Sequence, residues 1–321
     1  MRKTVGDNLK LYRMRADLSM AAAGELLKMS APAILKYERN KIVASMKKLE
    51  EFANAYNTTV EEILDIEDKI EIKFSNLKYQ NKTSGIRKEK IKEILKERIT
   101  EYFDVLKLSD ITLHNKFGVH PVNTLLEAET LATKLRIYFT IPLNTPISNL
   151  VYLLETSGMM ILTLPKDDLT KNFIGFYEII NGVPVIVVPE AENGYEQRMA
   201  IAKYLGELLI INEYKKPELV EEFALSLLIP RQSIIEEFDP KRIRVDFREI
   251  EIFSNNYRVS YKHIVNRLKY YKVITPSNAK YLNIYINKNN ISETAYFETA
   301  YNYEKLLAKL TAKNMVKSTN Q

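Results

Sequence analysis

Short amphipathic helices follow one another through the first 64 residues, and this pattern limits the fold more than any other feature. Apolar residues recur there at intervals of three and four, the period of an α-helix. Ser30 and Ser45 each precede such a run and are good N-caps, and Pro32 suits the first turn of the helix that Ser30 opens. The segment predicts a compact bundle of five helices, the third running from about Ala31 to Arg39.

Charge is unevenly distributed over this bundle. Residues 1–48 contain eleven basic and four acidic side chains, whereas residues 49–68 contain seven acidic side chains and no basic one. One side of the bundle is therefore expected to be basic, which permits contact with the phosphates of a nucleic acid. The simpler alternative is a solvated charged surface without a ligand.

The stretch from Leu18 to Lys41 resembles the helix-turn-helix of the Xre/Cro/CI repressor family. Leu18-Ser19 matches the start of the family's second helix, and Ile34 to Glu38 matches its recognition helix. The resemblance covers about residues 4–66 and implies that the helix from Ala31 to Arg39 docks in the major groove of double-stranded DNA. The DNA-binding residues that it implies are Ser30, Ala31, Ala33, Lys36, Tyr37, Arg39, Asn40 and Lys41.

These residues differ in what they can read. Ala31 and Ala33 can touch thymine methyl groups but cannot hydrogen-bond to a base edge, so direct readout falls mainly to Lys36. The other polar residues are better placed for phosphates. The glutamine usual at the start of the family's second helix is Met20 here, which removes one polar anchor. The alternative is that Lys36 and Arg39 are ordinary solvated helix residues.

Two segments follow the bundle. Residues 65–84 lose helical periodicity and predict a linker, whereas the stretch from Ile86 to about Leu108 predicts a long amphipathic helix. Operators with two-fold symmetry are read by dimers, so this helix is a candidate dimerisation element. The alternative is a helix that simply packs on the next domain.

A second resemblance covers residues 127–235, where helices precede and follow three strand-like runs. Pro146-Ile147, Leu205-Gly206 and Phe223-Ala224 are among the residues that match the ImmA/IrrE metallopeptidase family. In that family an HExxH helix binds zinc through its histidines and activates water with its glutamate. The corresponding positions here are Lys203, Tyr204 and Glu207, with Leu219 at the third-ligand position.

This residue set predicts a degenerate site without metal or catalysis. A lysine ammonium has no lone pair for zinc, and tyrosine cannot replace the glutamate base. Lys203 and Glu207 lie four residues apart on one helix face, so they are predicted to form an ion pair where the zinc would sit. The alternative is that both are exposed to solvent.

The last part of the chain predicts a helical module. One or two helices are expected from Arg248 to Ile274, a strand over Tyr281–Ile286, and a further helix from Glu293 to Lys313. The aromatic residues of the last helix are expected to serve a core or an oligomer surface.

Composition excludes several classes of protein. The chain has no cysteine, which excludes disulfides, thiolate metal sites and cysteine nucleophiles and suits a cytoplasmic location. It has only three histidines, so an enzyme that relies on several histidines is not expected. No Gly-rich phosphate-binding motif occurs, and no cofactor is expected. No apolar run is long enough to cross a membrane, and the first residues lack a signal peptide.

The sequence therefore predicts a mainly α protein with a small β-sheet, of α+β class. The expected domains are a helix-turn-helix DNA-binding domain at 1–68, a linker and helical spacer at 69–122, a degenerate ImmA/IrrE-like domain at 123–240 and a helical module at 241–321. This order resembles the master repressors of temperate phages and staphylococcal pathogenicity islands.

That resemblance implies a sequence-specific repressor without enzymatic activity. The partners it implies are a double-stranded DNA operator, a second copy of the chain in a homodimer or higher homo-oligomer, and an inducer protein, for example one encoded by a helper phage, that binds the C-terminal region and relieves repression. Two alternatives remain: an antitoxin or scaffold whose pseudo-peptidase domain holds a cognate protein, and a residual metallopeptidase.

Overall fold

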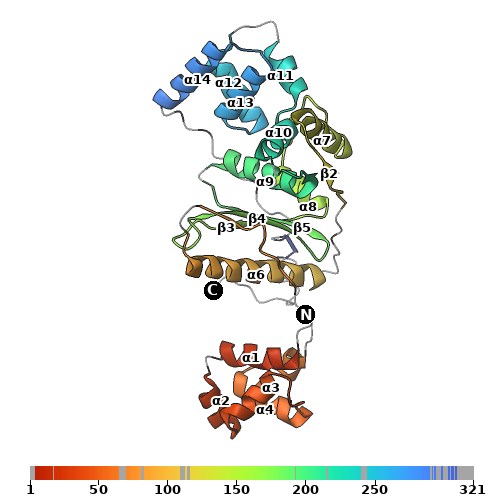
Figure 1. Ribbon diagram of the computed structural model, residues 1–321, viewed down its shortest axis with the longest axis vertical. Coiled ribbons are helices and arrows are strands. Elements are labelled where there is room, and N and C mark those ends of the chain that lie inside the picture. The colour runs from red at the N-terminus through yellow and green to blue at the C-terminus, as the bar shows by residue number, and fades with distance from the viewer. Residues whose placement is uncertain are drawn as a thin grey trace. The chain divides into compact units, whose positions relative to one another are not determined.

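The computed structural model divides the chain into two compact units, Met1–Glu71 and Ile72–Gln321. The structure describes residues 4–16, 18–64, 70–80, 83–108, 113, 116–191, 193–214, 216–239, 244–289, 291, 293, 298, 303, 305, 306 and 308. Helices dominate both units, and a small mixed sheet lies in the second, so the predicted α+β class is confirmed (Figure 1).

The first unit is a bundle of five helices: α1 (Val5–Arg15), α2 (Met20–Leu27), α3 (Ala31–Glu38), α4 (Met46–Tyr56) and α5 (Val60–Leu64). Serine side chains at positions 19, 30 and 45 accept a backbone N–H at the start of α2, α3 and α4, which satisfies donors that a helix leaves unpaired. Each helix contributes to one core, which contains Leu9, Ala23, Leu27, Ile34, Leu49, Phe52, Ala53, Tyr56 and Ile63.

The second unit is built on a four-stranded sheet of order β1-β4-β5-β3. Its strands are β1 (Lys78–Tyr79), β3 (Met160–Leu164), β4 (Phe173–Ile180) and β5 (Val183–Pro189). β3 and β5 run parallel, whereas β4 and β5 form a hairpin. Asn181 and Gly182 both have positive φ at the hairpin turn, as the tightest hairpin turns require. β2 (His120–Pro121) and β6 (Ile210–Ile211) form a separate parallel pair.

Helices cover both faces of the sheet, with α6 (Gly85–Leu108) on one side and α9 (Gly194–Leu209) on the other (Figure 1). The remaining helices are α7 (Leu125–Tyr138), α8 (Leu150–Thr156), α10 (Pro217–Leu228), α11 (Arg231–Phe238), α12 (Phe247–Tyr257), α13 (Tyr261–Tyr270) and α14 (Pro276–Lys288). None of the helices in the described ranges combines the length and hydrophobicity that crossing a bilayer requires.

Several expectations change at this level. The strand expected at Tyr281–Ile286 is wrong, because α14 spans it: Thr275 caps this helix, Pro276 occupies its first turn, and Ala279 and Leu282 are buried at helical spacing. The stripe of α6, including Ile91, is buried within the chain, as the packed-helix alternative requires. The helix expected from Glu293 to Lys313 lies mostly outside the described residues.

Candidate nucleic-acid interface

The turn between α2 and α3 is closely packed at its backbone. Lys28 adopts a left-handed conformation after α2, and the N–H of Met29 donates to the carbonyl of Gly24 at 2.8 Å. A Cβ atom on Gly24 would lie 2.5 Å from the carbonyl oxygen of Met29, so only glycine fits without a shift. This contact holds the backbone of the turn and the start of α3 close to α2.

α3 buries one side and exposes the other. Ile34 is fully buried in the core, whereas Lys36 is exposed and Ala31 and Ala33 are half-exposed. Ser30 caps the helix through its hydroxyl, which accepts from the N–H of Ala33 at 3.4 Å. The exposed side therefore presents small apolar groups in its first turn and a cation one turn later.

A buried ion pair fixes α3 against α1. Arg13 donates from Nε to Glu38 Oε1 at 2.6 Å and from Nη2 to Oε2 at 3.3 Å. Its Nη1 also donates to the carbonyl of Leu18 at 2.7 Å, just before α2. Hydrogen bonding with the Glu38 carboxylate raises the pKa of Arg13. Sequence reasoning missed this role because the two residues lie on different helices and each looks like an ordinary charged residue.

Two of the predicted DNA-binding residues have structural contacts. The side chain of Asn40, which has positive φ, accepts from the N–H of Gly6 at 2.9 Å and donates to the hydroxyl of Thr4 at 2.6 Å. The ring of Tyr37 packs edge-on against Phe52 with 5.3 Å between ring centres. Asn40 thus ties the end of α3 to α1, and the ring of Tyr37 is partly buried against the core of the bundle.

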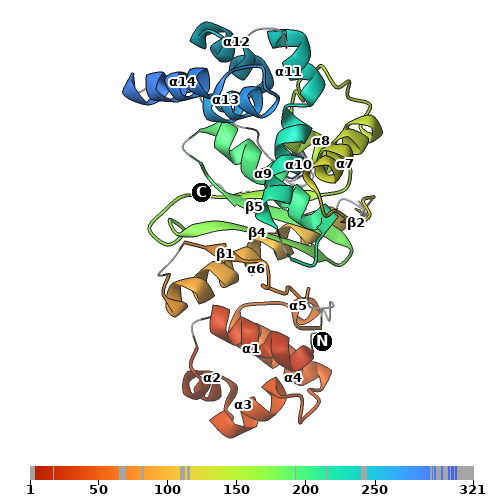
Figure 2. The same ribbon diagram turned by 45° about the horizontal axis from the view of Figure 1, so that its top comes forward.

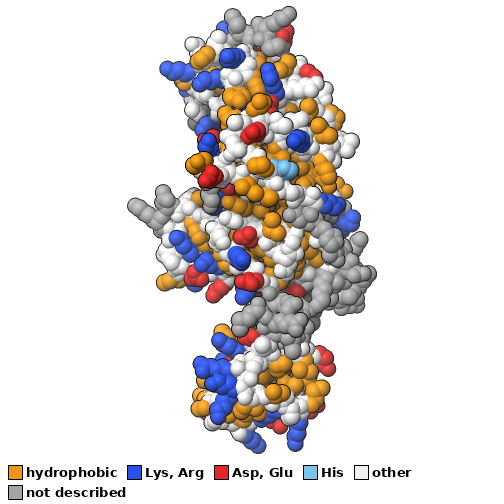
Figure 3. All heavy atoms as spheres, turned by 45° about the vertical axis from the view of Figure 1, so that its right-hand side comes forward, with side chains coloured by type: hydrophobic (Ala, Val, Ile, Leu, Met, Phe, Trp, Pro, Cys, Tyr) orange, Lys and Arg blue, Asp and Glu red, His pale blue; other side chains and the backbone are white. Residues whose placement is uncertain are grey.

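Basic residues border the exposed side of α3. Lys36, Arg39 and Lys41 are exposed and take part in neither of the two ion pairs that the structure describes in this unit, Arg13–Glu38 and Lys48–Glu51. Figure 3 shows Lys and Arg side chains gathered on one side of the first unit. Such a surface fits the negative charge of a nucleic-acid backbone.

The loop after α3 carries a feature that sequence reasoning passed over. Val43 is 93% exposed, and Ile42 and Met46 are also exposed, although all three are apolar. Exposed apolar side chains beside a basic helix can contact sugars and thymine methyl groups. The signal was present as Ile42 and Val43, two large apolar residues before the helix that Ser45 opens. Met46 was expected among the apolar residues of that helix but is exposed.

The residues that the sequence analysis matched to a zinc-binding helix have separate partners in the second unit. Lys203 on α9 pairs with Glu221 on α10 at 3.5 Å between Nζ and Oε1, and Leu219 is buried in the core. The predicted ion pair between Lys203 and Glu207 is wrong, because Glu207 binds the ammonium of Lys78 and accepts from the hydroxyl of Tyr177 at 3.0 Å.

Tyr204 is a buried side chain that packs against β4. Its hydroxyl donates to the carbonyl of Ile174 at 3.0 Å, and its ring centre lies 5.5 Å from that of Tyr177. Burial raises the pKa of Tyr204 well above its usual value, so the phenol stays protonated. Within the described residues, no three His, Cys, Asp or Glu side chains are grouped as a metal site requires.

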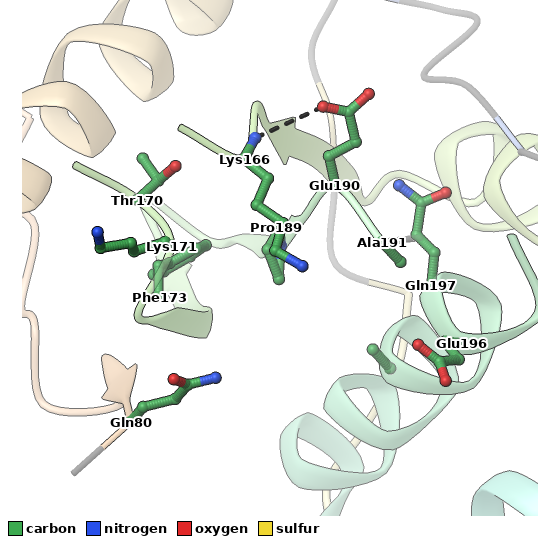
Figure 4. Close-up of a pocket in the computed structure, with 11 residues that line it drawn as sticks. Gln80, Lys166, Thr170, Lys171, Phe173, Pro189, Glu190, Ala191, Glu196 and Gln197 are labelled. Carbon is green, nitrogen blue, oxygen red and sulfur yellow. Dashed lines mark hydrogen bonds between the residues drawn. The ribbon is translucent and has the colours of Figure 1, made fainter. Parts of the chain in front are cut away.

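A shallow hollow of about 340 Å³ lies between one end of the sheet and α9 (Figure 4). Its wall includes both bases and acids, namely Lys166, Lys171, Glu190 and Glu196. The backbone N–H of Lys166 donates to Glu190 at 3.5 Å. This mixture of charges offers room for a small polar molecule and selects neither sign of charge.

A family described as a helix-turn-helix domain matches residues 4–65. The N-terminal unit is therefore a helix-turn-helix domain, which supports a role in DNA binding and transcription regulation. No curated protein matches the chain in sequence.

Two solved structures are similar to the chain at 12% sequence identity. One is a mutant of PrgX, with a TM-score of 0.17 and coverage of 99% of this chain and 97% of that one. The other is the apo form of the competence regulator ComR from Streptococcus vestibularis, with a TM-score of 0.18 and coverage of 96% and 97%.

Proposed function

We propose that the chain is a sequence-specific DNA-binding transcriptional repressor. The observation that carries the proposal is the exposed side of α3, where Lys36 points away from a bundle that matches a helix-turn-helix domain over 4–65. A helix presented in this way reads the major groove with residues in its first turns.

Different residues of this surface contact the bases and the phosphates of the DNA. Ala31 and Ala33 suit thymine methyl groups, and the Lys36 ammonium suits the acceptors of a guanine edge. Arg39 and Lys41 neutralise phosphates and set the position of α3 along the duplex. The operator that fits this surface therefore combines thymine with guanine in each half-site.

We extend the proposal to the second unit, as a non-catalytic domain of ImmA/IrrE type that receives an inducer protein in the cytoplasm. The residues at the HExxH positions support this reading, because Lys203 and Tyr204 supply no zinc ligand and no general base, and both already have protein partners. The chain would act as a homodimer on an operator of a phage-like mobile element. An inducer that binds the free form better than the DNA-bound form lowers DNA affinity by the same factor.

The first experiment measures binding of the purified chain to the DNA upstream of its own gene, over a series of salt concentrations. We expect tight, sequence-specific binding whose affinity falls steeply with salt, because each neutralised phosphate releases counterions. Scrambled DNA of the same composition is the control. Weak binding that does not distinguish the two DNAs would overturn the proposal.

A second measurement tests the non-catalytic part. We expect the purified chain to contain far less than one zinc per chain, and a chelator to leave its unfolding temperature unchanged. Stoichiometric zinc, or a fall in unfolding temperature with chelator, would contradict this part and leave the DNA-binding part standing.

A further inference from the structure

Residues 70–80 lie between α5 and α6 in the sequence, and we refer to them as the strap. From Phe74 to Tyr79 the strap contacts β4 at the edge of the sheet. Sequence reasoning expected a linker here, yet Lys78 and Tyr79 form β1 and pair antiparallel with β4 (Figure 2). The backbone N–H of Gln80 adds a hydrogen bond to the carbonyl of Asn172 at 2.8 Å. The strap thus covers an edge of β4 that would otherwise expose unpaired backbone groups.

The backbone pairing of the strap is short and irregular. β1 contains two residues, and the register shifts between them, with Lys78 opposite Gly175 and Tyr79 opposite Phe173. A longer, regular strand would make more hydrogen bonds to the same edge of β4. The strap is therefore a weak occupant of a surface that accepts extended peptides.

Side chains give this surface a chemical preference. The Lys78 ammonium binds the Glu207 carboxylate and lies 5.1 Å from the ring centre of Tyr177 and 5.4 Å from that of Tyr204. A position next to a carboxylate and near two aromatic rings favours a cationic side chain. Four residues earlier in the strap, Phe74 packs on Phe176 with 5.6 Å between ring centres.

The receptor side of this contact is independent of the strap. Glu207 accepts from the Tyr177 hydroxyl, and Tyr204 donates to the carbonyl of Ile174, so these groups keep partners when Lys78 leaves. Tyr204 also fills the space beside Gly175, where a Cβ atom would lie 2.2 Å from its hydroxyl oxygen. By contrast, the side chains of Lys78 and Glu207 are 39% and 31% exposed, which leaves the ion pair open to competition.

We propose that the strap is an internal occupant of a peptide-binding edge on β4, and that an extended segment of a partner protein carrying Lys or Arg displaces it. This inference rests on the proposed function in one respect, that the partner is the inducer. Displacement frees residues 70–80, which can span up to about 36 Å when extended. Because the DNA-binding units of an oligomer are held at an effective concentration set by their tethers, a longer tether weakens binding to paired half-sites.

The test uses a fluorescently labelled synthetic peptide with the sequence of residues 70–80 and measures its binding to the full chain by anisotropy. The tethered strap competes in the wild-type chain, so we expect weak binding there. A chain with Phe74→Ala and Lys78→Ala should bind the peptide at least about tenfold more tightly, because its own strap competes less. A chain with Lys78→Met alone should show the same direction of change.

Two controls identify the cation site. Glu207→Gln added to the weakened chain should reduce peptide affinity, and so should replacing the peptide's lysine at position 78 by methionine. Glu218→Gln, an exposed change in the first turn of α10, should leave it unchanged. Circular dichroism confirms that each chain is folded. Equal peptide affinity for the folded wild-type and weakened chains, or no effect of Glu207→Gln, would overturn the inference.

The outcome is separable from that of the proposed function, since the peptide assay contains no DNA. Strap displacement in a chain that does not bind its upstream DNA would keep the peptide-binding edge and reject the repressor. Specific DNA binding with no difference in peptide affinity between the chains would keep the repressor and reject the peptide-binding edge.

Discussion

Arg13 on α1 and Glu38 on α3 form a buried ion pair, with 2.6 Å between Nε and Oε1. Both side chains are almost completely buried, so neither charge can be solvated if the other is removed. The pair orients α3 from the side opposite to its exposed residues. The fold of the helix-turn-helix domain therefore depends on two charged side chains that lie in its interior.

We predict that Glu38→Leu alone lowers the free energy of unfolding of the first unit by about 3–5 kcal/mol, because it leaves the Arg13 guanidinium buried without a counter-charge. The double variant Arg13→Met, Glu38→Leu should recover most of this loss, because it replaces the pair with apolar side chains. Chemical denaturation followed by circular dichroism measures both. A double variant as unstable as the single one would show that the pair's geometry, rather than its charge balance, matters.

Gly24 and Gly85 provide a matched pair of helical glycines. Alanine usually stabilises a helix relative to glycine by up to about 1 kcal/mol, yet at Gly24 its Cβ would lie 2.5 Å from the Met29 carbonyl oxygen. We expect Gly24→Ala to destabilise the first unit by about 1–3 kcal/mol, as overpacking does. Gly85→Ala meets nothing within 4 Å and should be neutral or slightly stabilising. The same sign of change at both glycines would argue against the contact in the turn.

Substitution of three lysines distinguishes contacts with the bases from contacts with the phosphates. Lys36→Ala should reduce affinity for the operator by about 1–3 kcal/mol and relax specificity at one base pair. Lys41→Ala should weaken binding to all sequences alike and lower the salt slope by about 1. Lys10, exposed on α1, is the control, and its substitution should change operator affinity little. Competition binding with single-base operator variants checks this, and unchanged specificity after Lys36→Ala would move the readout to other residues.

The helices of the first unit could be predicted because their signals are local. Ser30 and Ser45 cap the helices that they were expected to open, and the capping residue and the first buried residue lie within one turn of each other. The same local reasoning failed at Tyr281–Ile286, where alternating apolar residues suggest a strand but Thr275 and Pro276 open a helix. The residues that start this helix lie before Tyr281, outside the six residues on which the strand prediction was based.

The contacts of α9 were beyond prediction for a different reason. The rule that pairs residues four apart on a helix considers only that helix, whereas Glu207 binds Lys78, a residue 129 positions away. Lys203 likewise finds its partner on α10. Long-range partners of this kind depend on how the sheet and helices pack, and the strap was expected to be a linker because two strand residues are too few for a periodic pattern.

His263 provides a test of the second unit by pH. Burial, followed by the nearby positive charge of Lys203, lowers the pKa of His263 below its ordinary value of 6.5, and its Nδ1 lies 2.7 Å from the hydroxyl of Ser260. Between that ordinary value and the lowered one, the unfolded chain binds a proton that the folded chain does not, so stability rises with pH. We expect the second unit to lose stability as pH falls below 6.5, through the lowered pKa.

Chains with His263→Gln and His120→Gln isolate this effect. Removing the titrating group should flatten the loss of stability over that pH interval in the His263→Gln chain, and the wild-type slope should persist with His120→Gln, which changes an exposed residue of β2. Urea unfolding at a series of pH values gives the change of stability with pH. The carboxyl groups of the protein contribute to this change equally in all three chains. Identical slopes in the two variants would show that the imidazole is protonated without cost in the folded chain.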